Sequence, residues 1–147
     1  MKKLMVRTAT IFTCFLMIHA TSRAQAEIKA KKFENPQWKT IVLVDLKPGK
    51  NDRALEIIKN YFVKANEKSG VAGPSLEVWL FSGEWDYMLV WDFKEGIEEM
   101  NWETSPNEVK WLNSMNEIAG SPEKGKAILD EFASLVNRST SYIGKIR

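Results

Sequence analysis

The chain has 147 residues, with 21 basic and 19 acidic groups and a net charge of +2 at pH 7. This length suffices for one domain with a substantial core and is too short for two. Its only cysteine, Cys14, and its only histidine, His19, both lie near the N-terminus, so chemistry that depends on either residue is confined to that segment.

The first 26 residues have the three parts of a secretory signal peptide. Basic residues open the segment, residues 11–18 form an apolar run, and Ala24-Gln25-Ala26 matches the A-x-A cleavage pattern. The run is shorter than the roughly 20 apolar residues that span a bilayer. The sequence therefore predicts an exported protein, periplasmic or secreted, whose mature chain begins at Glu27 and has no membrane segment.

Cys14 leaves an alternative open, in which it is the acylated cysteine of a bacterial lipoprotein. In that class of protein the cysteine ends the apolar region, whereas here residues 15–18 continue it. Cleavage after Ala26 is therefore the favoured interpretation, with a lipid anchor as the lesser one.

Removal of the leader would change the chemistry open to the protein. Residues 1–26 hold four basic groups and no acid, which leaves 17 basic against 19 acidic groups, a net charge of −2. Overall charge then gives no argument for nucleic-acid binding. Without cysteine and histidine, the mature chain would also exclude disulfides, thiol or histidine catalysis, Cys/His zinc sites and histidine-ligated haem.

The segment after the leader is polar up to Pro36. We expect residues 27–37 to form a mobile N-terminal arm, because a polar terminus has little to bury. Residues 38–147 then form one domain.

The first strand is predicted over residues 40–46, which are rich in β-branched side chains and stop at Lys47-Pro48-Gly49, a turn signal. Asn51 or Asp52 then caps a helix with apolar residues at helical spacing. Gly70 ends that helix, since glycine adopts the left-handed conformation found at helix ends.

Two more strands are predicted over residues 76–81 and 86–93, joined as a hairpin by residues 82–85. A short helical turn over residues 97–102 is a further possibility in the segment that follows.

Two helices come next. Ser105 caps the first, with Pro106 at its first position and Glu108 closing a capping box. Gly120 ends this helix, Ser121-Pro122 begins the second, and the last strand is predicted over residues 139–146 by elimination.

The resulting order, β-α-β-β-α-α-β, predicts an α+β fold of the split βαβ, ferredoxin-like kind, with helices on one face of a four-stranded antiparallel sheet. Both faces of the strands are largely apolar: Leu76, Val78 and Leu80 alternate with Trp79 and Phe81. One chain has helices for only one face. A second copy packed sheet to sheet, a two-fold homodimer, would cover the other.

This pattern resembles the dimeric α/β-barrel superfamily, which includes antibiotic-biosynthesis-type monooxygenases and NIPSNAP-like proteins. The resemblance covers about residues 38–147 and is carried by the element order, the turn at residues 46–49 and the run Gly83–Phe93. These motifs identify the scaffold rather than one member. The resemblance implies a cleft between sheet and helices for a small, often aromatic, molecule or haem; the haem-degrading members use a histidine that has no equivalent here.

The chain has six tryptophans, and we consider whether any of them contacts an aromatic ligand. Trp79 and Trp91 lie inside strands, so core and dimer-interface packing is the favoured interpretation. Trp111 lies off the apolar stripe of its helix and Trp102 precedes that helix, where a cleft mouth would be. These two and Tyr61 are the candidate ligand contacts.

Carboxylates are the remaining candidates for catalysis. Asp86 and Asp92 share one face of the third strand by parity, and Glu77 could join them from its neighbour. If buried, such a group would have a raised pKa and could accept a proton. We favour the plainer interpretation, that Asp86 belongs to the hairpin and Asp92 binds backbone; with no Asp/Asn ligand loop, no metal site is predicted.

The sequence thus favours an exported protein that binds a small apolar or aromatic ligand, and leaves open whether it is an enzyme. The alternatives are a monooxygenase-type enzyme that works without histidine or cysteine, and a non-catalytic interaction module. The cofactor, if any, is not predicted.

Overall fold

The computed structural model describes residues 28–146, so the predicted signal peptide, Cys14 and the cleavage site before Glu27 lie outside the described residues. The chain divides into two units, residues 1–33 and residues 34–147. In the first unit, residues 28–33 form no helix or strand. All the elements below belong to the second unit.

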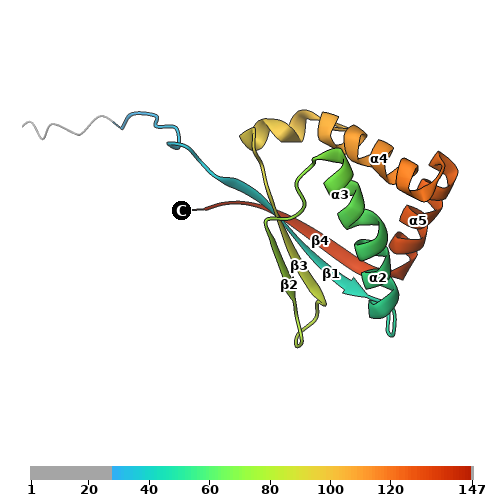
Figure 1. The fold of residues 1–147 in the computed structure, drawn as a ribbon. Helices are drawn as coiled ribbons and strands as arrows, with labels where there is room; N and C mark the ends of the chain where they lie inside the picture. Colours follow the sequence, from blue (N-terminus) through green and yellow to red (C-terminus); the bar gives the residue numbers. More distant parts are fainter. Residues whose placement is uncertain (1–27, 147) are drawn as a thin grey trace, which may run out of the picture. The chain divides into compact units, whose positions relative to one another are not determined.

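The second unit is built on a four-stranded antiparallel sheet with the strand order β2-β3-β1-β4 (Figure 1). The strands are β1 (Trp38–Leu46), β2 (Leu76–Trp79), β3 (Tyr87–Asp92) and β4 (Val136–Lys145). The two central strands, β1 and β3, are rich in the β-branched and aromatic residues that suit a pleated, buried surface. The predicted α+β, ferredoxin-like fold is confirmed.

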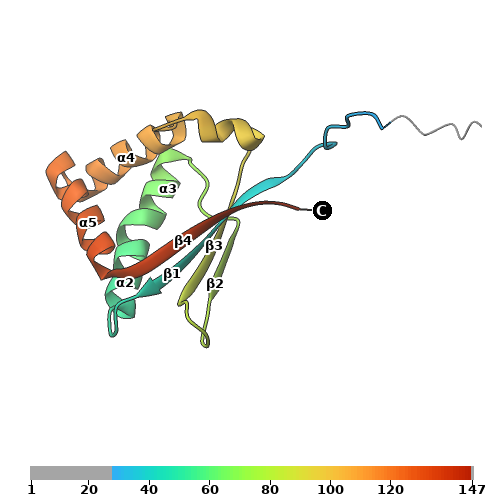
Figure 2. The same cartoon turned by 180° about the vertical axis from the view of Figure 1, so that it is seen from behind.

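Helices cover one face of this sheet (Figures 1 and 2). They are α2 (Asn51–Ile57), α3 (Val63–Ser69), α4 (Pro106–Ala119) and α5 (Pro122–Leu135). A single 3-10 segment, η2 (Gly96–Asn101), precedes α4 in the region where the sequence suggests a short helical turn.

A π-helical turn, η1 (Ile58–Phe62), joins α2 to α3, where the sequence predicts an uninterrupted helix. Gly70 ends the helix as expected, with a left-handed φ of 68°. A π turn carries more residues than an α turn and so changes which side chains face the sheet after it. Such turns occur frequently at functional sites.

Serine caps begin the last two helices, as predicted. The Glu108 backbone N–H donates to Ser105 Oγ at 3.1 Å, and the Lys124 N–H donates to Ser121 Oγ at 3.2 Å. Gly120 lies between the helices with φ 93°. These local signals fix the ends of α4 and α5 and therefore the turn between them.

The start of β4 differs from the prediction: the strand begins at Val136, directly after α5, and not at Ser139. The polar side chains of Asn137 and Arg138 favour a loop when the sequence is considered alone. In the structure they pair with the neighbouring strand: Asn137 Nδ2 and Arg138 Nε lie 2.8 Å and 3.2 Å from Asp45 Oδ2. A strand at the edge of a sheet tolerates such polar side chains.

The hydrophobic core lies between the sheet and the helices. Its buried members come from both layers: Val44, Leu46, Ala54, Ile57, Tyr87 and Leu135. Ile57 and Ala54 are fully buried, so the N-terminal half of the long helix is anchored against β1 and β3. Shortening Ile57 to alanine would cost about 2–5 kcal/mol.

The opposite side of the sheet, which we call the outer face, is also apolar. Alternation along the strands and the strand register place these residues on it: Ile41, Leu43, Leu76, Val78, Met88, Val90 and Tyr142. No helix of the described chain covers it, and Leu76 and Tyr142 are 48% and 56% exposed. The predicted two-sided apolar sheet is therefore present.

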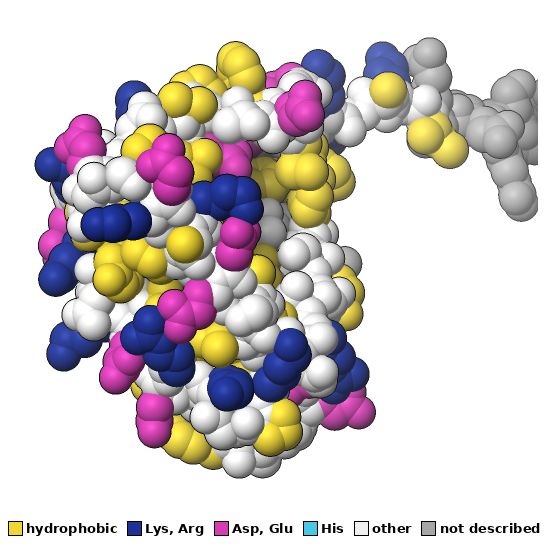
Figure 3. All heavy atoms as spheres, turned by 90° about the vertical axis from the view of Figure 1, so that its right-hand side faces the viewer, with side chains coloured by type: hydrophobic (Ala, Val, Ile, Leu, Met, Phe, Trp, Pro, Cys, Tyr) yellow, Lys and Arg dark blue, Asp and Glu magenta, His cyan; other side chains and the backbone are white. Residues whose placement is uncertain are grey.

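Charged side chains of both signs are interspersed on the face shown in Figure 3. One pair joins two helices: the Arg53 guanidinium donates to both carboxylate oxygens of Glu131, at 2.7 and 2.9 Å, and so links α2 to α5. Among residues 28–146, no helix combines the length and apolar character that crossing a membrane requires.

Candidate functional site

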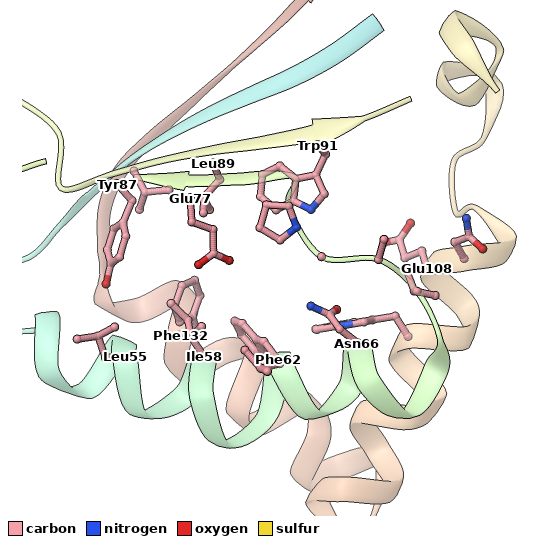
Figure 4. Close-up of a pocket in the computed structure, with 18 of the residues that line it drawn as sticks. Leu55, Ile58, Phe62, Asn66, Glu77, Tyr87, Leu89, Trp91, Glu108 and Phe132 are labelled. Carbon is pink, nitrogen blue, oxygen red and sulfur yellow. The ribbon is translucent and has the colours of Figure 1, made fainter. Parts of the chain in front are cut away.

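A cavity of about 480 Å³ lies between the helix-facing side of the sheet and the helices (Figure 4). Its floor comes from β2 and β3, its opposite wall from α2, η1 and α3, and its rim from residues 71–74 and the start of α4. Small-molecule sites in proteins typically have volumes of about 300–1,000 Å³ and mostly apolar walls. The cavity is therefore the candidate functional site.

Aromatic rings from both layers line the cavity. The sheet contributes Trp79, Tyr87 and Trp91, and the helices contribute Phe62, Trp111 and Phe132. Edge-to-face contacts hold several of these rings in place.

Phe62, the last residue of the π turn, is at the centre of the helix-side rings. Its centroid lies 5.5 Å from that of Trp111 and 4.9 Å from that of Phe132, at interplanar angles of 63° and 68°. One side chain thus couples α4 and α5 to the helix that faces the sheet. The aromatic wall depends on the position that the π turn gives to Phe62.

Strand register explains the sheet side. Trp79 pairs with Tyr87, and Glu77 pairs with Leu89, so all four side chains project toward the helices. Trp91 projects the same way, opposite the short Thr40 of β1. A small residue beside a large one leaves room at this end of the sheet.

Among the described residues, carboxylates are the only charged groups that line the cavity. Figure 4 shows the Glu77 side chain directed from the sheet into the space between sheet and helices, with Ile58 and Phe62 on the facing helix. Glu108, in the first turn of α4, also lines the cavity, together with the neutral polar side chains of Asn66, Ser105 and Asn107. No lysine or arginine is among the lining residues.

Tyr87 is the most deeply buried polar side chain of the cavity wall. It is 5% exposed, and its hydroxyl has no hydrogen-bond partner among the described residues. Burial, and to a smaller extent the charge of Asp86, raise the pKa of Tyr87 above its ordinary value. The phenol therefore stays protonated and can act as a hydrogen-bond donor.

The three predicted ligand contacts, Tyr61, Trp102 and Trp111, lie in different environments in the structure. Trp111 lines the cavity. Tyr61 packs against the hydrophobic core and is not among the lining residues, because the π turn directs its neighbour Phe62 to the cavity instead. Trp102 is 54% exposed and lies outside the lining.

The three candidate carboxylates do not come together. Asp86 Oδ2 accepts the backbone N–H of Leu46 at 2.7 Å, and Asp92 binds Lys39 and the Ser75 hydroxyl. Neither lines the cavity. Those two hydrogen bonds, from Lys39 first and Ser75 second, lower the pKa of the Asp92 carboxyl, so Asp92 stays ionised.

Glu77 does not join that pair, which the sequence leaves open as the less favoured interpretation. Its register with Leu89 puts it on the helix-facing side, whereas Asp92, opposite Lys39, lies on the outer face. Glu77 is instead the one carboxylate that the described strands contribute to the cavity lining. Alternation along β2 puts Glu77 on the same face as Trp79 and on the opposite face from Val78. This alternation is the sequence signal that could have assigned Glu77 to the cavity.

The sequence interpretation assigns Trp79 and Trp91 to core and dimer packing, and Trp79 does pack against the hydrophobic core. Both line the cavity. Strand parity predicts that they share a face of the sheet with Tyr87 and Leu89. The volume of the cavity over that face depends on the distance between the sheet and the helices, which no local sequence pattern determines.

The described residues include no cluster of three or more histidine, cysteine, aspartate or glutamate side chains placed to hold a metal ion. The described residues that line the cavity also include no histidine. The lining residues thus do not fit a histidine-ligated haem.

No profile of a known protein family matches this chain, and no curated protein matches its sequence. Its fold matches solved structures. A NIPSNAP family protein of unknown function from Agrobacterium tumefaciens superposes with a TM-score of 0.52 and 12% identity, over 80% of this chain and 94% of that one. Another NIPSNAP family protein from the same organism gives 0.50 and 9%, over 74% and 90%.

A dimeric ferredoxin-like protein from an uncultured marine organism gives a TM-score of 0.40 and 10% identity, over 78% of this chain and 90% of that one. At these identities the NIPSNAP matches establish a shared scaffold and not a shared activity. The resemblance inferred from the element order is thereby confirmed for the fold.

Proposed function

We propose that this protein binds a small apolar or aromatic molecule in the cavity between sheet and helices. The observation that carries the proposal is the wall of six aromatic side chains around a space of about 480 Å³. Rings held by edge-to-face contacts offer flat apolar surfaces that lose little conformational freedom when a planar ligand packs on them.

The proposal can be tested by calorimetric titration of the mature protein with tryptophol, a neutral aromatic alcohol. We expect saturable binding, and a loss of about tenfold or more in affinity for Trp111→Ala, because a large ring is removed from the wall. Trp102→Ala is the matched control, since Trp102 is exposed and outside the lining. Equal effects of the two substitutions would contradict the assignment.

A monooxygenase-type activity has less support. Two of its three candidate carboxylates, Asp86 and Asp92, are engaged away from the cavity, which leaves Glu77 and Tyr87 as its titratable groups on the sheet side. Binding needs only the apolar wall, and so it is the function that the geometry supports best.

The outer face supports a second part of the proposal, a homodimer packed sheet to sheet. Its apolar centre is bordered by ion pairs, Lys39 with Asp92 at one end and Arg138 with Asp45 at the other. An apolar centre with a polar rim is the usual composition of a protein interface. A second copy related by a two-fold axis presents the same outer face, so one interface covers the outer faces of both copies.

Export is the third part of the proposal. It rests on the basic, apolar and A-x-A parts of residues 1–26. A binding protein outside the cytoplasm, with no cysteine in its mature chain, would form no disulfide there.

A further inference from the structure

The charges that line the cavity are all of one sign. Glu77 enters from β2 and Glu108 from α4, while the remaining polar side chains, Asn66, Ser105 and Asn107, are neutral. No basic side chain lines the cavity. Among residues 28–146, neither carboxylate takes part in an ion pair, in contrast to Glu131, which Arg53 neutralises.

The surroundings make these charges effective. Glu77 and Glu108 are exposed at the cavity, and Glu77 points into a space walled by aromatic rings (Figure 4). A ligand that displaced water from this space would bring its charge beside apolar walls, where electrostatic interactions are stronger than in bulk water. The positive end of the α4 dipole would favour an anion, but Glu108 already occupies that first turn. The electrostatics of the cavity therefore favour a cation.

The rings provide the second requirement for binding a cation. Trp79, Trp91 and Trp111 all line the cavity, and the face of an indole attracts ammonium groups through its quadrupole. Glu77 thus has aromatic faces around it that can share the charge of a ligand and also bury its apolar body.

Tyr87 adds an independent sign of an incomplete site. Its side chain crosses the space between β3 and the helix that carries Leu55 (Figure 4), and its hydroxyl is buried without a partner. Buried hydroxyl groups in folded proteins are nearly always hydrogen-bonded. A polar ligand that reached this end of the cavity would supply the missing partner.

We propose that the cavity selects aromatic or apolar amines, in which a protonated amino group pairs with Glu77 and the hydrophobic body packs against the rings. This inference rests on the proposed binding function and adds the charge of the ligand. Carboxylate-bearing ligands of the same body are disfavoured, because no lining group can neutralise them.

The test is a calorimetric titration at pH 7 with three probes that share an indole body: tryptamine, which is cationic, tryptophol, which is neutral, and indoleacetate, which is anionic. We expect the affinity for tryptamine to exceed that for tryptophol by about tenfold, the usual effect of one charge-assisted hydrogen bond, and indoleacetate to bind most weakly. If tryptophol or indoleacetate binds as tightly as tryptamine, the charge preference is overturned and the binding function stands. If none of the three binds, the binding function fails and the charge preference with it.

Substitution locates the preference. Glu77→Gln should remove most of the tryptamine advantage and change the affinity for tryptophol by less than about twofold, because it removes charge and retains shape. Glu67→Gln is the matched control, an exposed glutamate of α3 that does not line the cavity. A tryptamine advantage that survives in Glu77→Gln would overturn the assignment to Glu77.

Discussion

Trp79 of β2 and Tyr87 of β3 are cross-strand partners whose ring centroids lie 3.6 Å apart, with 60° between the ring planes. Both rings line the cavity, and the contact helps to bury the Tyr87 hydroxyl. One pair thus forms part of the cavity wall and holds a polar group without a partner among the described residues.

Removal of that hydroxyl should not weaken the protein. We expect Tyr87→Phe to unfold with a free energy equal to that of the parent or about 1 kcal/mol higher, because a buried hydroxyl without a partner carries a desolvation cost that phenylalanine avoids. Urea denaturation without ligand measures the difference. A loss of stability above about 1 kcal/mol would reveal a hydrogen bond that the structure does not contain.

The same residue predicts a pH dependence. Burial raises the pKa of folded Tyr87 above the 10.0 of an ordinary tyrosine, so the folded state holds this proton more tightly than the unfolded chain. This contribution to stability is complete below pH 10 and is lost progressively as the pH rises further. Above pH 10 the parent should therefore lose about 1.4 kcal/mol per pH unit more than Tyr87→Phe. A stability curve for Tyr87→Phe that runs parallel to that of the parent above pH 10 would contradict the shift.

The contact between α4 and α5 predicts a stability loss at a glycine. A Cβ atom at Gly125 would lie 2.1 Å from Asn116 Oδ1 and 3.2 Å from Asn116 Cα, so the Asn116 side chain must turn away and the two helix backbones must separate by a few tenths of an ångström. We expect Gly125→Ala to lose about 1–3 kcal/mol in thermal or urea unfolding, despite the better helix propensity of alanine. A Cβ at Gly144 meets nothing within 4 Å, so Gly144→Ala should be close to neutral; similar losses for both would argue against the close approach.

The outer face predicts the state of association. Light scattering should give the mass of two mature chains at micromolar concentration. Val90→Lys should give a monomer, because it puts a charge at the apolar centre of the sheet face. Val109→Lys adds the same charge to an exposed position of α4 and should leave the dimer intact. A monomeric parent would mean that the outer face is covered in another way.

The leader predicts a processed N-terminus. Mass spectrometry of protein recovered from the periplasm or medium should show a chain that begins at Glu27, because Ala24 and Ala26 are the small residues that signal peptidase requires. Soluble cytosolic protein that retains Met1 would contradict export. Detection of a lipid on Cys14 would contradict cleavage after Ala26 and would support the lipoprotein alternative.

Local chemistry explains which features of the fold the sequence predicts well. The ends of α4 and α5 are specified by single residues, Ser105, Gly120 and Ser121, that satisfy backbone groups within one turn. The π turn is not visible in the sequence, since the same apolar spacing fits an α-helix. The start of β4 was missed because Asn137 and Arg138 are polar, and only the neighbouring Asp45 makes them suitable for a strand.

The site was predicted less completely, for a related reason. Parity along β2 and β3 determines which side chains share a face, and it placed Trp91 with Tyr87 and Leu89. Whether a face is filled or hollow depends on the distance between layers, and that distance is set by tertiary contacts such as Phe62 against Trp111. The place of Trp102 in the chain predicts a position at the cleft mouth, whereas its side chain is exposed and outside the lining, and the cavity is lined by Trp79 and Trp91.

The most direct measurement of ligand binding in the cavity is fluorine NMR of the mature protein labelled with fluorotryptophan. All six tryptophans follow the proposed cleavage site at Ala26: Trp79, Trp91 and Trp111 line the cavity, and Trp38, Trp85 and Trp102 do not. Single Trp→Phe substitutions assign the resonances. Titration with tryptamine should shift the three cavity resonances together and leave the other three in place. Shifts confined to Trp38, Trp85 or Trp102, or no shift at saturating tryptamine, would contradict a binding site in the cavity.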